Sequence, residues 1–179
     1  MTSTETGAPR PKIRLHVASD LAIGAVVDLA DDQAHYVSHV MRLGSGDAVA
    51  LFNGRDGEWL ARVGELAKRS VRLAVDHRLR PQASEPDVWL VFAPLKRARL
   101  DYLAEKATEL GVAELRPVLT RRTMVDRVNV DRLWANAREA AEQTERLSVP
   151  AVRDPVSLAA LIASWPAERT EAYLKFFNQ

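Results

Sequence analysis

The sequence contains no cysteine, so neither a disulfide framework nor a thiolate metal site is possible. It also lacks a transmembrane run and a secretory signal. The polar, proline-bearing start MTSTETGAPRPK predicts a disordered tail over residues 1–12, and the expected compartment is the cytoplasm. The turn after the apolar run VWLVFAP, Pro94-Leu95-Lys96-Arg97, has no glycine. This excludes a Walker loop and a dinucleotide fingerprint there, and argues against an ordinary Rossmann or nucleotide-hydrolysing enzyme.

Histidine is also scarce. The chain has four, and no G-x-S-x-G motif accompanies them, so a serine hydrolase has little support. His35 and His39 are spaced i, i+4 on a predicted helix and could face one metal ion. No Glu follows His35 and no third ligand is evident, so we favour a packing or surface role and predict no metal site.

Charge is balanced overall but unevenly distributed. The 179 residues carry a formal net charge of +1, and 47% of them are hydrophobic, which is enough for a real core. Residues 1–54 hold four Lys/Arg against six Asp/Glu, whereas residues 96–146 hold eleven against nine. A nucleic-acid binder can be locally basic and globally neutral, so the net charge excludes nothing.

The first half of the chain has the pattern of a small β-barrel, expected over residues 13–82. Two apolar runs flank Asn53–Gly57, whose Asn and glycines suit a tight hairpin loop. Val71, Leu73 and Val75 alternate with polar residues, as in a half-buried strand. The predicted strands are 14–19, 25–30, the two arms of 47–63, and 70–80, with one helix over 31–44 that ends near Gly44.

After a linker at 81–87, the pattern changes to that of a parallel α/β sheet, expected over residues 87–179. The predicted strands are 88–94, 112–120 and 171–177, and the predicted helices are one ended by Gly111, one over 131–146 and one over 154–165. The first helix is expected to turn Leu100, Leu103, Ala107 and Leu110 inward, and the second Trp134, Ala137, Ala141 and Thr144.

Arginines are the candidate functional residues. Arg121 and Arg122 follow a parallel-type strand, and ligands of open α/β sheets gather at the carboxyl ends of strands. Lys96, Arg97 and Arg99 open a helix, where the helix dipole prefers anions; cations at that position suggest a phosphate partner. For Arg121 and Arg122 the alternative is surface solubility. For Arg138, Glu139, Glu142, Gln143 and Arg146 the alternative is a solvated face with the i, i+4 pairs Arg138–Glu142 and Glu142–Arg146.

Three strings in the sequence resemble a known family. HYVSHVMRLGSGDAVALFNGRDGEWLARV, EKATELGVAELRPVLTRRT and AREAAEQTERLSVP are similar to the RsmE family of 16S rRNA uridine-N3 methyltransferases, members of the SPOUT class. The resemblance runs from about residue 14 to residue 165. It implies a PUA-like β-barrel followed by a SPOUT-type α/β domain, S-adenosylmethionine as cofactor, 16S rRNA or the small ribosomal subunit as partner, and a homodimer.

The resemblance also assigns roles to residues. It implies that Arg122 faces the target base or its phosphate, and that Glu142, Gln143 and Arg146, which match the family's E-Q-x-x-R, line the same catalytic cleft. Phosphate contacts are expected from the barrel and from the basic residues of the second half; the candidates are Arg42, Lys68, Arg69, Arg72, Lys96, Arg97 and Arg121.

One expected segment does not occur. The family's G-P-E-G-G loop and L-G-x-x-I-L-R-x-E-T-A stretch, which hold the cofactor pocket and the trefoil knot, are not in this sequence. We therefore expect a C-terminally truncated SPOUT domain, with the cofactor-binding residues unknown and much of the usual dimer interface missing. The alternatives are a non-catalytic RNA-binding module or inactive fragment, and, less attractive given the basic clusters, a protein-interaction domain.

Overall fold

The computed structural model describes residues 10–123, 125 and 127–169, and these residues form two compact units. Of the described residues, the first unit holds those up to Glu85 together with Arg138–Val149. The second holds those from Pro86 to Ala137 and from Pro150 to Arg169. Each unit has its own hydrophobic core. The grouping of residues 138–149 with the barrel is a feature that the linear domain boundaries predicted from the sequence do not contain.

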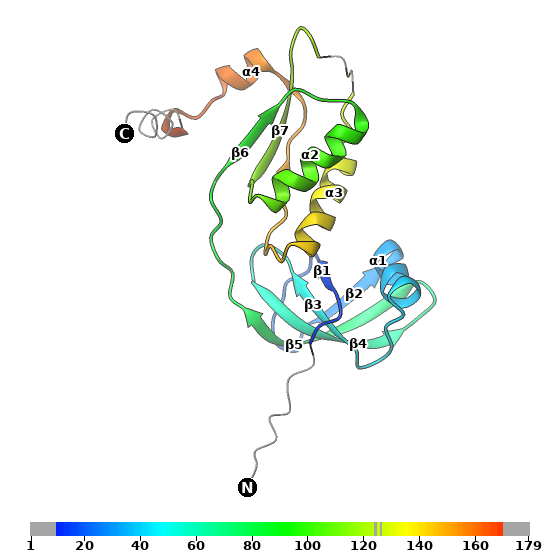
Figure 1. Cartoon of the computed structure of the whole chain (residues 1–179). Helices are drawn as coiled ribbons and strands as arrows, with labels where there is room; N and C mark the ends of the chain where they lie inside the picture. The colour runs from blue at the N-terminus through cyan, green and yellow to red at the C-terminus, as the bar shows by residue number, and fades with distance from the viewer. Residues whose placement is uncertain (1–9, 124, 126, 170–179) are drawn as a thin grey trace. The chain divides into compact units, whose positions relative to one another are not determined.

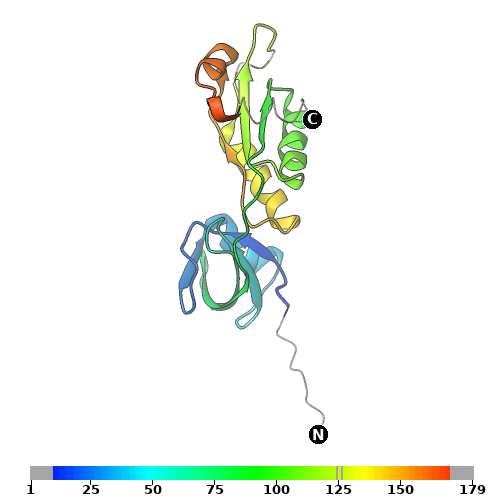
Figure 2. The ribbon, with the colours of Figure 1, turned by 90° about the vertical axis from the view of Figure 1, so that its left-hand side faces the viewer.

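The first unit is built on a five-stranded sheet in the order β1-β3-β4-β5-β2. Its strands are β1 (Arg14–His16), β2 (Val26–Ala30), β3 (Ala48–Phe52), β4 (Glu58–Leu66) and β5 (Ser70–Arg80). Only β1 and β3 pair in parallel; the other pairs are antiparallel. Register shifts between β4 and β5 bend the long strands, and the sheet curls around its core (Figure 2). The predicted β-barrel is confirmed.

The core of the first unit follows the predicted alternation. Val71, Leu73 and Val75 on β5 are buried, whereas Arg72 and Ala74 between them face solvent. The predicted helix over 31–44 is shorter than expected. It consists of α1 (Asp31–His35) and a π-helical turn, η1 (Tyr36–Val40), closed by the Met41 N–H on the Tyr36 carbonyl. The helix ends before Gly44 because Arg42 adopts a left-handed φ of 53°.

The hairpin loop between β3 and β4 is held by the side chain of Asn53. Its Oδ1 accepts the backbone N–H groups of Arg55 (3.0 Å) and Asp56 (2.9 Å), and its amide donates to the Asp56 carboxylate (2.6 Å). Gly57 is required at the end of the loop, since its φ is +88° and a Cβ there would lie 2.3 Å from the Arg80 carbonyl oxygen. The local sequence thus determines this turn, as predicted.

The second unit is a parallel sheet in the order β6-β7-β8, with β9 also pairing with β7. The strands are β6 (Trp89–Phe92), β7 (Glu114–Leu119), β8 (Ala151–Val152) and β9 (Val156–Ser157), and the helices are α2 (Arg97–Glu109), α3 (Val130–Gln143) and α4 (Leu158–Ala163). Phe92, Leu100, Ala104, Leu115 and Leu133 form a core that joins α2 and the start of α3 to one face of the sheet (Figure 1). The predicted parallel α/β character is confirmed.

Several details of the second half differ from the sequence predictions. Leu110 is 84% exposed instead of buried, because α2 ends at Glu109 and Gly111 turns the chain with a φ of +86°. Thr144, predicted to face inward, is exposed because α3 ends before it. Leu133, which was not among the predicted inward residues, is buried. Residues 156–157 form β9, so the predicted helix over 154–165 is reduced to α4. The predicted strand over 171–177 lies outside the described residues.

Of the predicted tail over residues 1–12, residues 1–9 lie outside the described part of the chain. Lys12 is well anchored, since its N–H donates to the Ala48 carbonyl (3.0 Å) and its ammonium pairs with Asp47 (2.8 Å), so the prediction was wrong at that residue. Among the described residues, no helix has the length and apolar character needed to cross a membrane.

Candidate functional site

Arg121 and Arg122 occupy the two central positions of a tight turn at the end of β7. The Thr123 N–H donates to the Thr120 carbonyl (3.1 Å), and the Thr120 N–H donates to the Thr123 hydroxyl (2.8 Å). The two threonine hydroxyls also lie 3.1 Å apart. This reciprocal pairing fixes the T-R-R-T turn. Both arginines are exposed, and neither shows a hydrogen bond or ion pair within the part of the chain that the structure describes.

The start of α2 lies at the same edge of the sheet. β6 and β7 run parallel, with Phe92 opposite Pro117, so the segments that follow both strands emerge on one side. Lys96 is the N-cap of α2, but no side chain caps this end and the first turn contains no acidic residue. Lys96 and Arg97 are exposed. The fold therefore brings together the predicted basic residues Lys96, Arg97, Arg121 and Arg122 at the carboxyl edge of the parallel sheet.

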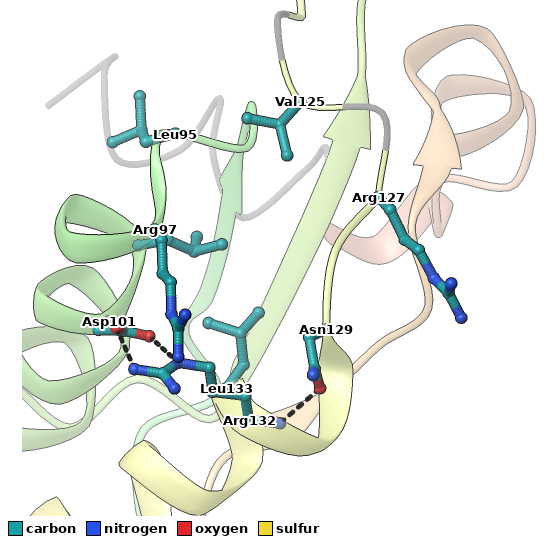
Figure 3. A pocket seen from close by; sticks show the side chains of 9 residues that line it. Leu95, Arg97, Asp101, Val125, Arg127, Asn129, Arg132 and Leu133 are labelled. Atoms are coloured by element: carbon teal, nitrogen blue, oxygen red, sulfur yellow. Dashed lines mark hydrogen bonds and ion pairs between the residues drawn. The ribbon is translucent and has the colours of Figure 1, made fainter.

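A pocket of about 420 Å³ opens beside this edge, between α2 and the residues that lead into α3 (Figure 3). Arg132 binds Asp101 through two hydrogen bonds, of 2.8 Å and 2.6 Å, and Asn136 adds a third (2.9 Å). The hydrogen bond from Arg132 holds the pKa of Asp101 below its ordinary value, against the opposing effect of burial. Arg97 is directed toward this pair in Figure 3.

The other predicted catalytic residues lie in the first unit, around the end of α3. The Arg14 guanidinium donates to the carbonyls of Ala141 (2.9 Å), Glu142 (3.0 Å) and Arg146 (2.8 Å), and so satisfies carbonyl groups that the helix end leaves open. The same guanidinium binds Glu58 at 2.5 Å. Arg14 thus ties the end of α3 to the barrel strands.

Glu58 is the buried anion at the centre of this network. It also accepts a hydrogen bond from Arg80 (2.7 Å), whose guanidinium in turn donates to the Glu145 carbonyl (3.0 Å). Burial alone would raise the pKa of Glu58, but the hydrogen bonds from Arg80 and Arg14 hold it below its ordinary value. The carboxylate is therefore charged and shared by two arginines.

Glu142 and Arg146 are held inside the first unit. Glu142 accepts the His16 backbone N–H (3.0 Å), and burial raises the pKa of its carboxyl. Arg146 is buried and forms an ion pair with Glu85, which also accepts the Ser148 hydroxyl (2.7 Å). The alternative of a solvated face is therefore wrong for these two residues. Because α3 ends at Gln143, Arg146 does not lie one turn further along the helix. Gln143 itself is exposed.

The basic residues predicted to contact RNA from the barrel are all exposed, but they differ in their local partners. Arg72 pairs with Asp28 (3.0 Å) and Glu65 (3.0 Å), and Arg69 pairs with Asp31 (3.3 Å). For Arg42 and Lys68, the structure shows no ion pair among the described residues. Arg42 and Lys68 are thus the barrel cations whose charge is least offset.

His35 and His39 lie side by side in the structure. The rings of His35 and His39 stack with their centroids 4.7 Å apart, and the Ser38 hydroxyl lies 2.7 Å from His39 Nδ1. No group of three or more His, Cys, Asp or Glu residues capable of holding a metal is found in the described ranges. Both histidines are exposed, so of the two roles favoured above, packing or surface, the structure supports the surface role.

Two groups of residues in and around the site could not be recognised from the sequence. Arg14 and Glu58 belong to no motif, because Arg14 and its partners are separated by 44 to 132 positions. Arg127 and Arg132 belong to the pocket, yet only their spacing from the T-R-R-T turn could have drawn attention to them. Long-range ion pairs of this kind leave no local pattern.

Comparison with known proteins identifies the class. A family model described as the RNA methyltransferase domain matches residues 82–177, and one described as the RNA methyltransferase PUA domain matches residues 29–76. The chain belongs to the RNA methyltransferase domain family, and its barrel is the PUA-like domain that precedes it. The predicted class of fold, a PUA-like barrel followed by a SPOUT-type α/β domain, is confirmed.

Particular relatives agree with this class and with the RsmE resemblance. The chain is 33% identical over 146 residues to the ribosomal RNA small subunit methyltransferase E of Rickettsia conorii, covering 81% of this chain and 60% of that protein. It is 31% identical over 163 residues to the protein of the same name from Synechocystis sp., covering 90% of this chain and 54% of that protein. The chain thus spans little more than half the length of these curated relatives.

A solved structure shows the same fold. The ribosomal RNA small subunit methyltransferase E of Neisseria gonorrhoeae, solved bound to S-adenosyl methionine, superposes with a TM-score of 0.79 at 24% identity. The match covers 87% of this chain and 67% of that chain. At this identity the likeness establishes the arrangement of the elements only.

Proposed function

We propose that this chain supplies the RNA-binding and base-activating residues of an S-adenosylmethionine-dependent methyltransferase that modifies N3 of a uridine in 16S rRNA. The observation that carries the proposal is the T-R-R-T turn, which presents Arg121 and Arg122 at the carboxyl edge of the parallel sheet. The names of the relatives, small subunit rRNA methyltransferases, supply the substrate class.

The chemistry needs an anion to be stabilised. The N3–H of uracil is a weak acid, so the neutral base is a poor nucleophile, and loss of the proton leaves a negative charge shared by N3, O2 and O4. A guanidinium that donates to O2 or O4 stabilises this charge as it develops and aligns the base. We assign this role to Arg122. Arg121, next to it in the turn, is the phosphate contact.

The cofactor, when bound, supplies an electrophilic methyl group on a positively charged sulfur. The described edge does not fit it: its exposed charged groups are the guanidiniums of Arg97, Arg121 and Arg122 and the ammonium of Lys96, and the nearby carboxylate of Asp101 is already bound by Arg132 and Asn136. A cationic surface fits the uracil anion or an RNA phosphate. No described residue is therefore assigned to holding the cofactor.

The remaining predicted residues keep separate roles in the proposal. Gln143 is exposed at the end of α3 and is available to contact the RNA. Glu142 and Arg146, held by His16 and Glu85, position that helix end. The barrel adds RNA affinity through phosphate contacts. Arg42 and Lys68 are expected to contribute more than Arg69 and Arg72, because the latter two are paired with carboxylates. A cytoplasmic homodimer is the expected working form.

A methylation assay tests the proposal. The complete gene product is incubated with unmodified small ribosomal subunits and labelled S-adenosylmethionine, and the modified nucleotide is identified by mass spectrometry. We expect one methyl group on N3 of a uridine in 16S rRNA. A methyl group on a ribose or on a base carbon, or no transfer, would contradict it.

The second candidate function is a non-catalytic RNA-binding module. It is favoured by the exposed basic edge together with the lack of an assigned cofactor residue. Calorimetry with S-adenosylmethionine on this 179-residue chain separates the two candidates. Binding supports an enzyme contained in this chain, whereas RNA binding without cofactor binding supports the module.

A further inference from the structure

The loop between β3 and β4 contains the only asparagine in the sequence that is followed by glycine, Asn53-Gly54. In such a pair the backbone nitrogen of the glycine can attack Cγ of the asparagine side chain. A five-membered succinimide forms and ammonia leaves, and water then opens the ring to aspartate or isoaspartate. Glycine favours the reaction because it has no side chain to hinder the attack and a freely rotating backbone. In the unfolded chain, Asn53 is therefore the asparagine most prone to lose its amide.

In the folded barrel, both ends of the Asn53 carboxamide are held, and the residue is only 6% exposed. The carboxamide oxygen accepts the backbone N–H groups of Arg55 (3.0 Å) and Asp56 (2.9 Å). The carboxamide nitrogen donates to the Ser19 carbonyl (3.0 Å) and to the Asp56 carboxylate (2.6 Å). Succinimide formation makes Cγ tetrahedral and expels this nitrogen as ammonia, so the four hydrogen bonds must be broken first. The fold thus opposes the reaction that the local sequence favours.

The product of deamidation does not fit the same loop. The Asp56 carboxylate also accepts the Leu21 N–H (2.9 Å), and the hydrogen bond from Asn53 lowers the pKa of Asp56, so this carboxylate is charged. An aspartate at position 53 would place a second anionic oxygen against Asp56, where a donor now lies. Two like charges in contact repel each other, and a charge at this buried position is costly to desolvate. Isoaspartate would also add a methylene to the backbone of the loop.

The loop joins two interior strands of the barrel sheet, β3 and β4. Phe52 and Glu58 pair next to the loop, and both are buried. Glu58 is also the anion shared by Arg14 and Arg80. A loop that cannot close therefore disrupts the packing and the charge network of the whole barrel unit.

We propose that Asn53-Gly54 is a deamidation site whose reaction is controlled by the stability of the barrel. While the hairpin is folded the amide is protected, and each opening of the hairpin exposes it to a modification that prevents refolding. The gradual inactivation of this chain is therefore expected to follow the population of the open hairpin. The proposal concerns the barrel unit alone and holds whether or not the chain takes part in methyl transfer.

The first test is the rate of deamidation as a function of urea concentration. The chain is incubated at mildly alkaline pH and digested with trypsin, and peptide 43–55 is analysed by mass spectrometry for replacement of –NH2 by –OH. The rate should be at least about a hundredfold lower in the folded chain than in the unfolded one, since a stable domain is unfolded for only a small fraction of the time. It should rise in proportion to the unfolded fraction measured by circular dichroism. Peptide 128–132, in which the exposed Asn129 precedes a valine, is the internal control and should react slowly at every urea concentration.

A matched pair of variants tests the consequence of the reaction. Asn53→Asp imitates one product of deamidation. Asn129→Asp makes the same chemical change at an exposed position, where the side-chain oxygen accepts the Arg132 N–H (2.9 Å). A carboxylate accepts this bond as well as an amide does. Only Asn53→Asp should therefore lower the midpoint of urea denaturation.

Three outcomes would overturn the proposal. A rate in peptide 43–55 that is the same in the folded and the unfolded chain would mean that the hairpin does not protect Asn53. A wild-type midpoint for Asn53→Asp would mean that the deamidated loop still closes. Equal decreases in the midpoint for both variants would mean that the added charge acts on the chain as a whole and not through the contacts of Asn53.

Discussion

In the barrel unit, the arginines around the end of α3 are paired with carboxylates and carbonyls, and the side chains of Arg14 and Arg146 are only 12% and 8% exposed. In the α/β unit, Arg97, Arg121 and Arg122 face solvent at the carboxyl edge of the sheet. Arginine therefore has two roles in this protein: it holds the barrel unit together where it is buried, and it presents positive charge to solvent at the edge of the α/β unit. A buried guanidinium destabilises the fold unless a carboxylate or carbonyl pairs with it, and a guanidinium paired in this way is not available to a ligand. The exposed group is the one that can bind RNA.

The largest decrease in stability is expected in the buried network. Glu58→Ala removes the carboxylate shared by Arg14 and Arg80 and leaves the largely buried Arg14 without its counterion. Breaking a buried pair in this way costs about 3–5 kcal/mol in the free energy of unfolding. Urea denaturation measures it. Glu65→Ala, which removes a carboxylate exposed on the barrel surface, is the control and should leave the midpoint almost unchanged. Similar midpoints for both variants would contradict the structural role of the network.

A smaller and pH-dependent effect is expected from His16 in the same unit. Burial, with Arg138 and Arg55 nearby, lowers the pKa of His16 from 6.5 to about 4. As the pH falls from 6.5 toward 4, the unfolded chain takes up a proton that the folded chain does not, so the free energy of unfolding decreases. The slope is at most about 1.4 kcal/mol per pH unit.

The variant His16→Asn isolates this contribution. It keeps the backbone N–H that binds Glu142, whose raised pKa acts in the opposite direction in both proteins. The wild type should lose more stability than the variant between about pH 6.5 and pH 5, measured by denaturation at each pH. Parallel pH profiles would show that His16 is protonated as easily in the folded protein as in the unfolded one.

A still smaller effect on stability is expected from Asp101→Asn at the edge of the α/β unit. This change removes the negative charge that offsets the partly exposed Arg132 and its neighbour Arg97, so RNA affinity should rise, by no more than about tenfold. The salt dependence of binding should become steeper. Anisotropy with oligouridylate measures both. A decrease in affinity would mean that Asp101 contributes to binding other than by pinning Arg132.

The parts of the fold that depend on neighbouring residues could be predicted from the sequence. The β3–β4 hairpin follows from Asn53 and Gly57, and the inward face of β5 follows from the alternation of Val71, Leu73 and Val75. Both signals lie within a few residues of the structure that they determine. The parallel sheet of the second unit was predictable for the same reason, from continuous apolar runs separated by an amphipathic helix.

The features that depend on distant residues could not be predicted. The end of α3 is fixed by Arg14, more than a hundred positions earlier, and this contact places Glu142 and Arg146 inside the first unit. From the sequence alone they looked like a solvent-exposed helix face. The T-R-R-T turn was visible as a motif, but the threonine pairing that turns both arginines outward required the structure.

The most direct measurement concerns Arg122, for which the smallest change in stability is expected. In the complete gene product, Arg122→Ala should lower the rate of uridine methylation by about a hundredfold or more, because the uracil anion loses its hydrogen-bond donor. The free energy of unfolding should stay within about 0.5 kcal/mol of the wild type, as for other exposed residues. Methylation at the wild-type rate, or a decrease in stability large enough to account for the missing activity, would contradict the separation of buried, structural arginines from exposed, functional ones.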